Sequence, residues 1–356
     1  MEASIVIPTR NKASYLELTL ESLVHQSFEP SQYEVIVVDD GSTDRTSAVV
    51  EHFRGRAWNF RCIEQVPAGR SAARNVGIRA ARGKVVIFVD DDCLCNRNLV
   101  AAHVASHDET SNKVVIGWYQ DVLSRIPLHR ESLIHNVEGM LNRLGNIPTA
   151  LSLEKAAAIL PETLDIITTN DIIRNPEKIG LLELGGDMVY YTHFQHIAEG
   201  RCSCPWIVFW TRNVSVQRDT LLQAGLFDED FQGWGEEDAE LGYRLFRAGI
   251  TFQTTMDAVI YHQLHPYHGM AVYKKEWLRN YMKFAEKYKT PEIYLRWQEV
   301  ERVISLDQYE CTVRQIEAGL LSQAELQAIK DRYDSFVAGH LPLDREPDTK
   351  LDKDLV

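Results

Sequence analysis

Short apolar segments alternate with helical patterns through the N-terminal third of this sequence, and this alternation limits the fold more than any other feature. Segments expected to form strands lie at residues 4–8, 33–38, 60–66 and 84–89. The last is rich in β-branched residues, as in a strand buried on both faces. Ser14 to Glu17 match a capping box, which predicts a helix start, and a second helix is expected over residues 71–81. This order predicts an α/β fold with a mostly parallel sheet flanked by helices.

Carboxylates follow directly on two of the expected strands. Asp39 and Asp40 end one strand, and Asp90, Asp91 and Asp92 end another. Three adjacent carboxylates repel one another, so a folded protein rarely gathers them without a cation. Oxygen ligands suit Mg²⁺ or Mn²⁺, and magnesium often shares its shell with substrate phosphates. Because ligands bind at the carboxyl ends of parallel strands, these residues are expected to form one site. A solvated acidic loop is the alternative.

The usual phosphate-binding glycine motifs are absent from the sequence. No Gly-x-Gly-x-x-Gly follows the first expected strand, and no Walker-type Gly-Lys-Ser/Thr occurs. Arg70 and Arg74 begin the helix expected over residues 71–81 and are placed to face a diphosphate. Arg70 is therefore included in the expected nucleotide-binding set, with a surface position as the alternative for either arginine. Asp91 of the acidic triad is included in the same set.

A tryptophan between two glycines precedes a pair of carboxylates. Gly233 and Gly235 flank Trp234, and Glu237 and Asp238 follow in the first turn of an expected helix. The helix dipole keeps carboxylates ionised there. An aromatic platform beside an ionised carboxylate suits holding a sugar and deprotonating its hydroxyl. The alternative is an ordinary acidic helix start.

A series of motifs, in order along the chain, carries a resemblance to a known family. Residues 5–11, 38–44, 69–77 and 88–92 resemble the successive motifs of family 2 glycosyltransferases with the GT-A fold, which is Rossmann-like. Residues 234–245 and 258–263 resemble the corresponding stretches of bacterial chondroitin polymerase domains. Galactosyltransferases and polypeptide GalNAc-transferases share a similar Trp-Gly-x-Glu element. The stretch from roughly residue 121 to 204 is unmatched.

The resemblance implies a site for the uridine nucleotide of a UDP-sugar. Pro8, Arg10 and Asp40 match positions that contact the uracil, and Thr9 and Asp39 lie beside them. Arg10 replaces the more usual tyrosine.

The resemblance also implies a metal site. Asp90 and Asp92 match the Asp-x-Asp motif, with Asp92 as the direct ligand and Asp90 contacting the metal's water or the ribose. His262 matches a second metal ligand, and His265 and His268 lie close enough to take its place. The implied cofactor is Mn²⁺ or Mg²⁺.

The residues implied for catalysis follow the unmatched stretch. Asp238 matches the catalytic base of inverting members, with Glu237, Trp234 and Gly235 at the donor or acceptor sugar. Asn213 is expected to shape the sugar pocket. A cation stabilises the leaving diphosphate while the acceptor hydroxyl attacks the opposite face and Asp238 takes its proton. The acceptor is a glycan, a lipid-linked sugar or a small molecule.

Two other functions remain open from the sequence. A sugar nucleotidyltransferase shares the sheet and an aspartate-bound metal, but it is expected to carry a glycine-rich, lysine-containing loop where residues 8–11 stand. A non-catalytic nucleotide-sugar binding subunit has no need of a base such as Asp238.

The composition suggests one catalytic domain with an appendage. We expect a GT-A domain over residues 1–268, with a nucleotide-binding half (1–120) and an acceptor half (121–268). A helical extension is expected over 269–340, with helices at 273–289, 294–306 and 322–338, and a disordered tail over 341–356. The net charge of -13 argues against nucleic acid as a partner.

The cysteines and the C-terminal basic residues leave alternatives open. Two Cys-x-Cys pairs, Cys93 with Cys95 and Cys202 with Cys204, superficially suggest zinc, but reduced thiols are the simpler account. No signal peptide and no run of 18 apolar residues is found, so a cytoplasmic location is expected. The basic and aromatic residues of 274–289 leave open a peripheral contact at the inner face of a membrane; packing on the catalytic domain is the alternative.

Overall fold

One large sheet organises the chain. The computed structural model describes residues 1–56, 58–107, 112–122, 124–127, 163–165, 167–174, 187–265 and 270–340. Within these ranges eight strands form one sheet in the order β3-β2-β1-β4-β9-β6-β10-β5. The strands are β1 (Ala3–Thr9), β2 (Tyr33–Asp39), β3 (Phe60–Glu64), β4 (Val85–Phe88), β5 (Cys93–Cys95), β6 (Lys113–Val122), β9 (Val214–Gln217) and β10 (Thr251–Gln263). A separate ribbon pairs β7 (Arg125–Pro127) with β8 (Thr163–Asp165).

The strand directions confirm the mostly parallel sheet. β1 is parallel to β2 and β4, β2 to β3, and β6 to β10. Only β9, between β4 and β6, and β5, at the edge beside β10, run antiparallel to their neighbours in this sheet of the described residues. The carboxyl ends of β1, β2, β4, β6 and β10 therefore share one edge with the amino end of β9.

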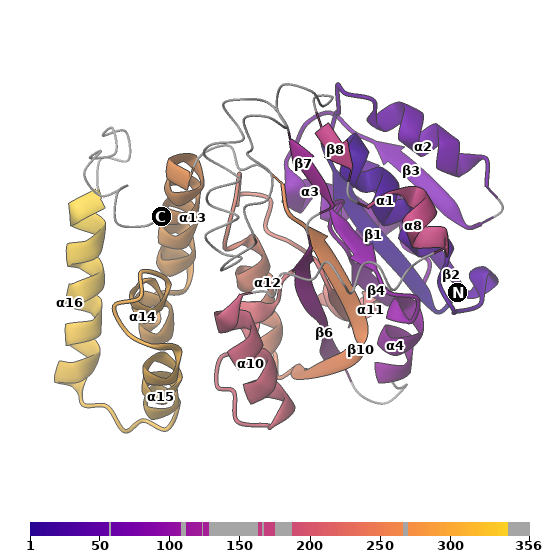
Figure 1. Cartoon of the computed structure of the whole chain (residues 1–356). Coiled ribbons are helices and arrows are strands. Elements are labelled where there is room, and N and C mark those ends of the chain that lie inside the picture. The colour runs from indigo at the N-terminus through magenta and orange to yellow at the C-terminus, as the bar shows by residue number, and fades with distance from the viewer. Residues whose placement is uncertain are drawn as a thin grey trace, which may run out of the picture.

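Helices cover the sheet (Figure 1). Those that precede the C-terminal extension are α1 (Ala13–Val24), η1 (Pro30–Gln32), α2 (Thr46–Arg54), α3 (Arg70–Ala80), α4 (Leu99–Ser106), α8 (Thr169–Arg174), α10 (Met188–Ala198), η3 (Pro205–Val208), α11 (Arg218–Gln223) and α12 (Glu237–Arg247). The central strands are apolar and buried on both faces, as β2 shows along its whole length. A Cβ on Gly77 of α3 would lie 2.3 Å from Val6, so this glycine lets the helix approach β1 closely.

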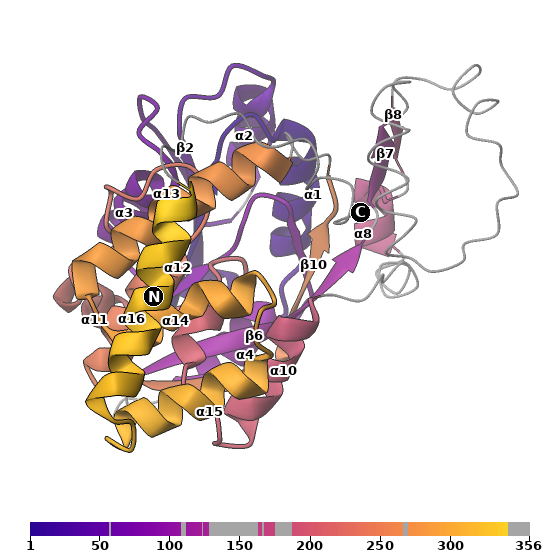
Figure 2. The ribbon, with the colours of Figure 1, turned by 90° about the vertical axis from the view of Figure 1, so that its left-hand side faces the viewer.

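The C-terminal extension is a helical layer that packs on the catalytic part. It comprises α13 (Met270–Tyr288), α14 (Pro291–Val300), α15 (Leu306–Glu317) and α16 (Gln323–His340), which lie beside α10 and α12 (Figure 1) and in front of the sheet in the turned view (Figure 2). The helix expected over residues 294–306 ends at Val300, and α15 was not expected. Phe284 packs against Trp206 and Tyr243 with ring centroids 5.8 and 5.7 Å apart, and residues of both parts share one apolar core.

The aromatic residues of α13 face the protein, whereas its lysines and its arginine are exposed. Trp277 and Tyr281 are buried. Lys287 bonds to Asp228 and Glu240. The helix thus packs on the rest of the protein through its aromatic face, and a membrane contact of its exposed basic residues stays a prediction. In the described part of the chain no helix combines the length and apolar character needed to span a bilayer. The expected tail over residues 341–356, most of 121–204 and His268 lie outside the described residues.

Candidate active site

The predicted site residues meet at the shared edge of the sheet. The backbone N–H of Asp40 donates to the carbonyl of Thr9 at 2.9 Å, which joins the ends of β1 and β2. The N–H of Gln263 donates to the carbonyl of Asp92 at 2.8 Å, which joins the end of β10 to the acidic triad. Since β9 is antiparallel, the residues just before it, Thr211 and Arg212, also reach this edge.

Asp92, His262 and His265 form a cluster suited to a metal ion. His265 Nε2 lies 3.1 Å from Asp92 Oδ2, and His262 Nε2 lies 3.7 Å from Asp92 Oδ1. The three donor atoms lie within 4.8 Å of one another. His262 Nδ1 lies 2.9 Å from Asp121 Oδ1, an outer-shell contact that turns Nε2 towards Asp92. The two imidazoles with a carboxylate fit Mn²⁺ better than Mg²⁺.

Positive charge surrounds Asp92. Lys12 Nζ lies 3.1 Å from Asp92 Oδ2. Burial favours the neutral acid, but His262, Lys12 and His265 outweigh it and hold the pKa of Asp92 well below its usual range. The carboxylate is thus ionised and available to a cation.

The other two acids of the triad are placed differently. Asp90 faces Arg74, whose Nη2 lies 3.4 Å away, and is not part of the cluster of candidate metal ligands. Asp91 accepts a 2.7 Å hydrogen bond from the Thr9 hydroxyl. Burial, with repulsion from Asp92, raises the pKa of Asp91 to about 7. The acidic triad is therefore divided among three environments.

The expected uracil-contacting residues lie around the ends of β1 and β2. Asp39 accepts a hydrogen bond from the Ser42 N–H at 2.8 Å. Asp40 accepts from the Gln65 side chain and from the N–H groups of Ala68 and Gly69. Both carboxylates thus shape the adjoining loops, and their contact with a base stays a prediction.

Pro8 is half-buried and Arg10 is exposed at the same end of β1.

A buried arginine holds the two predicted catalytic carboxylates. Arg74 Nη1 lies 3.1 Å from Glu237 Oε1 and 3.1 Å from Asp238 Oδ1. Asp238 Oδ2 accepts hydrogen bonds of 3.1 Å from both the N–H and the hydroxyl of Thr211. Arg70 is 40% exposed and its Nη1 lies 3.7 Å from Glu237, so Arg74 has the closer contacts with the acids.

The environment of Asp238 suits a base. Burial, together with Glu237 and Asp90, raises the pKa of Asp238 to about 7, although Arg74 and the Thr211 N–H oppose the rise. A general base works best with a pKa near the pH of the reaction.

The C-terminal helices build the loop that carries Trp234. The loop turns through three residues with positive φ, namely Gly233 (81°), Gly235 (94°) and Glu236 (67°). Asn280 of α13 donates to the carbonyls of Trp234 and Gly235 at 3.3 and 2.8 Å. The indole of Trp234 is 43% exposed, so it can serve as the expected platform for a sugar.

The carboxylate of Glu236 anchors this loop. It accepts from Trp277 Nε1 at 2.8 Å and from Arg296 Nε at 3.2 Å. Both partners lie on C-terminal helices, so the position of α12 depends on that layer.

The residue expected to shape the sugar pocket lies in the core. Asn213 is 1% exposed and donates to the carbonyls of Trp118 and Ala258, while its Oδ1 contacts His103 Nε2 at 2.8 Å. These contacts join β6, β10 and α4 through the Asn213 side chain, and its expected part in shaping the sugar pocket stays a prediction.

Its neighbour Arg212 was missed in the sequence. Its guanidinium lies over the rings of Tyr119 and Trp210, 4.6 and 4.7 Å from their centroids. Burial lowers the pKa of Arg212, but nearby groups that include Asp90 and Asp121 outweigh it and raise the pKa above its usual value. This cation therefore lies near the acidic residues of the metal-binding edge. The signal available in the sequence was its position directly before a strand that begins at that edge.

Comparisons with known proteins agree with this geometry. Residues 4–152 match the sequence model of the family described as Glycosyl transferase family 2. The uncharacterized glycosyltransferase YfnE of Bacillus subtilis (strain 168) is 35% identical over 276 residues, which are 75% of this chain and 66% of that protein. Chondroitin synthase of Escherichia coli is 31% identical over 266 residues, 74% of this chain and 35% of that protein. The chain therefore spans only part of either relative.

The fold also has a solved counterpart. The structure of GalNAc-T7 with UDP, GalNAc and Mn²⁺ aligns with a TM-score of 0.52 at 14% identity and covers 94% of this chain and 54% of that one. The sheet and the arrangement of helices are thus those of the GT-A fold. The N-terminal part of the chain, residues 4–152, belongs to glycosyl transferase family 2 by its match to the model of that family.

Proposed function

We propose that this enzyme transfers a sugar from a UDP-sugar to a hydroxyl acceptor in a metal-dependent reaction that inverts the anomeric configuration. The observation that carries the proposal is the position of Asp238. Its partly buried carboxylate is held by Arg74 and Thr211 on the same sheet edge as Asp92, His262 and His265. A base and a metal-binding cluster on one edge suit a single displacement.

Asp238 takes the proton from the acceptor hydroxyl. Its Oδ1 and Oδ2 are fixed by the arginine and the threonine, so one lone pair of the carboxylate can be directed at the hydroxyl without a change of rotamer. Glu237 pairs with the same nitrogen of Arg74, Nη1, and helps to keep that cation in place. Trp234 offers its exposed ring to an apolar face of a sugar.

Asp92, His262 and His265 would hold Mn²⁺ or Mg²⁺, and the mixed nitrogen and oxygen donors favour manganese. When bound, the cation stabilises the charge that develops on the departing diphosphate. Asp121 orients His262, and Arg212 supplies a fixed positive charge near the same edge. The nucleotide end of the donor lies against Pro8, Arg10, Asp39 and Asp40, by their match to the family's motifs.

A panel of UDP-sugars with Mn²⁺ tests the proposal. UDP should be released from one UDP-sugar of the panel, and the release should stop when a chelator is added. Where no acceptor is known, slow hydrolysis of the UDP-sugar supplies the readout. The anomeric configuration of the product, read by NMR, should be opposite to that of the donor. Retention would contradict the single displacement, and equal turnover with chelator would contradict the metal dependence.

Three variants assign the metal ligands. Asp92→Ala should abolish metal-dependent UDP binding, and His262→Ala should weaken manganese-supported turnover more than it lowers the unfolding midpoint. His265→Ala should behave like His262→Ala. Pyrophosphate release from UTP and a sugar 1-phosphate would instead identify a nucleotidyltransferase, and donor binding without any turnover would identify a binding subunit.

A further inference from the structure

A second cluster of metal-binding side chains lies outside the active site. His193 on α10, Cys202 and Cys204 in the following loop, and Glu310 on α15 place one donor atom each within 4.8 Å of the others. Cys202 Sγ lies 3.1 Å from Glu310 Oε1, and Cys204 Sγ lies 3.8 Å from His193 Nε2 and 3.9 Å from Glu310 Oε1. These separations resemble the edges of a tetrahedron around an ion, whose bonds are about 2.3 Å to sulfur and about 2.0–2.1 Å to nitrogen.

The imidazole of His193 is oriented for a metal. Its Nδ1 lies 3.0 Å from the carbonyl oxygen of Val189, which can only accept, so Nδ1 carries the proton. Nε2 then presents a lone pair to Cys204 and the rest of the cluster. Metal-bound histidines commonly donate their other ring N–H to a backbone carbonyl in this way.

Glu310 is positioned in the same manner. Its side chain is almost fully buried, and Oε2 lies 2.8 Å from His196 Nδ1 while Oε1 faces both thiols. The Arg314 guanidinium lies 3.7 Å away and is half exposed. A buried carboxylate is costly unless it is paired, and the Oε1 atom that faces the cysteines would gain a pairing charge from a cation bound there.

We propose that His193, Cys202, Cys204 and Glu310 bind one structural Zn²⁺ ion. Two thiolates, one imidazole and one carboxylate give the four ligands of a closed tetrahedral site. The thiol protons leave to solvent on binding. Thiolate ligands favour zinc over Mg²⁺ and Mn²⁺, so this cluster differs in selectivity from that around Asp92.

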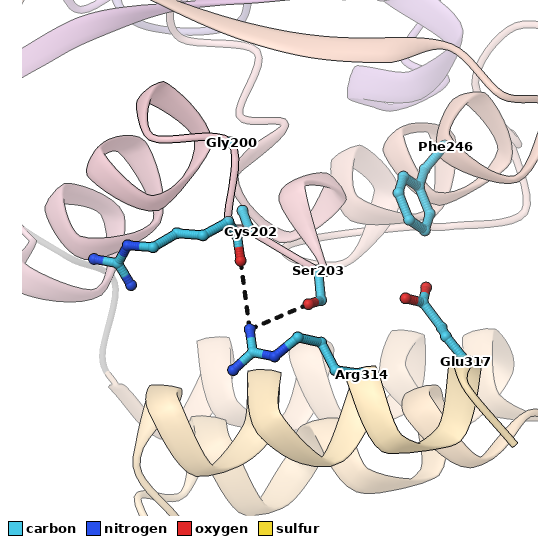
Figure 3. A pocket seen from close by; sticks show the side chains of 7 residues that line it. Gly200, Cys202, Ser203, Phe246, Arg314 and Glu317 are labelled. Carbon is cyan, nitrogen blue, oxygen red and sulfur yellow. Dashed lines mark hydrogen bonds between the residues drawn. The ribbon is translucent and has the colours of Figure 1, made fainter. Parts of the chain in front are cut away.

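The cluster joins the C-terminal layer to the segment beneath the catalytic helix. Cys204 directly precedes η3, and η3 packs against α12, where a Cβ on Gly242 would lie 2.9 Å from the Trp206 carbonyl. Arg314 of α15 reinforces the junction by donating to Ser203 Oγ and to the Arg201 carbonyl (Figure 3). A pocket of about 530 Å³ is lined in part by Cys202, one of the four residues of the cluster (Figure 3).

The other Cys-x-Cys pair supplies a matched control. Cys93 and Cys95 have the same spacing and are buried, but they lie on β5, and neither belongs to a group of three or more candidate metal donors among the described residues. A four-thiolate site made from both pairs is therefore not what the structure shows.

Metal analysis of the purified full chain tests the proposal. Dialysis against a weak chelator removes metal ions from the cluster around Asp92. After this step the wild-type chain should retain one equivalent of zinc. Cys202→Ser and Cys204→Ser should lose it, whereas Cys95→Ser and His262→Ala should keep it. Cobalt in place of zinc should give the thiolate charge-transfer band of a tetrahedral centre, absent in Cys202→Ser.

A measurement on the wild-type chain covers the case in which a variant fails to fold. A strong chelator should first remove all metal from the wild-type chain. Zinc added back should then raise the unfolding midpoint by at least about 5 °C and protect two of the six cysteines from a thiol reagent. No retained zinc, together with no shift and no protection, would overturn the proposal. Zinc retained equally in Cys202→Ser and Cys204→Ser would overturn it as well.

Discussion

Asp238 and Glu237 are neighbours that both contact Arg74, but their surroundings separate their roles. Asp238→Asn should lower the transfer rate by roughly 10²–10⁴-fold, because the amide cannot accept a proton. Donor affinity, measured by calorimetry with Mn²⁺, should be retained. Glu237→Gln is the matched control and should cost about tenfold, as expected for losing one hydrogen bond to a charged group. A large loss in Glu237→Gln with Asp238→Asn nearly unaffected would reverse the assignment.

The pKa of Asp238 predicts the pH dependence of the enzyme. Burial raises it to about 7, helped by Glu237 on the same helix and Asp90 at the end of β4, and opposed by Arg74 on α3 and the Thr211 N–H. A base must be ionised, so kcat/KM should rise with pH and level off above about pH 7. Arg74→Gln removes the opposing cation and should move this rise in kcat/KM to higher pH. A rise that stays at the same pH would show that a group other than Asp238 titrates.

Site residues that lie in motifs could be predicted from the sequence, whereas residues whose place depends on the pairing of distant strands could not. Asp92, Asp238 and His262 lie in recognisable motifs, so their meeting at one edge could be predicted from a parallel sheet. Arg212 has no motif, and its place over Tyr119 depends on β6 and β9 pairing, which is a long-range contact. The burial of the Asn213 amide could not be predicted for the same reason, since only the folded sheet shows it.

Among the elements, helix starts were the least predictable. Ser14 makes no capping bond, because α1 begins at Ala13 and the Asp44 carboxylate accepts from the Ala13 N–H at 3.1 Å. A capping box does form at Ser305 and Gln308, and it starts the helix that was not expected. In the first case a side chain 31 positions away supplies the cap, which no local pattern can reveal.

Helix α13 governs the loop that presents Trp234. Asn280→Ala removes the donor to three carbonyls, those of Gln232, Trp234 and Gly235. The loop should then lose its fixed turn, so KM for the acceptor should rise while donor affinity stays the same. Thermal unfolding should report a modest cost of about 1–3 kcal/mol for the unpaired groups.

Arg279→Ala is the control, because Arg279 donates to the Gln232 carbonyl alone. An Asn280→Ala enzyme with wild-type acceptor kinetics would show that the loop is held by other contacts.

For the whole molecule, the apolar core continues across the boundary expected near residue 268. Trp206 and Tyr243 of the catalytic part pack on Phe284, and the buried Glu236 has its partners on α13 and α14. The amphipathic pattern of α13 shows an apolar face, but not which surface covers it. The partner of this apolar face therefore could not be predicted from the sequence, and a membrane contact of the exposed basic residues stays a prediction.

Truncation tests this continuity. A chain ending at residue 268 exposes the aromatic core and leaves Glu236 without Trp277 and Arg296. Breaking one buried ion pair costs about 3–5 kcal/mol, and a domain has only about 5–15 kcal/mol of stability. The truncated chain should therefore lose its near-ultraviolet circular dichroism and its cooperative thermal transition. A chain ending at His340 keeps α16 whole and should unfold like the full chain, so it controls for shortening itself. A cooperative transition with UDP binding in the shorter chain would show that residues 1–268 fold as an independent unit.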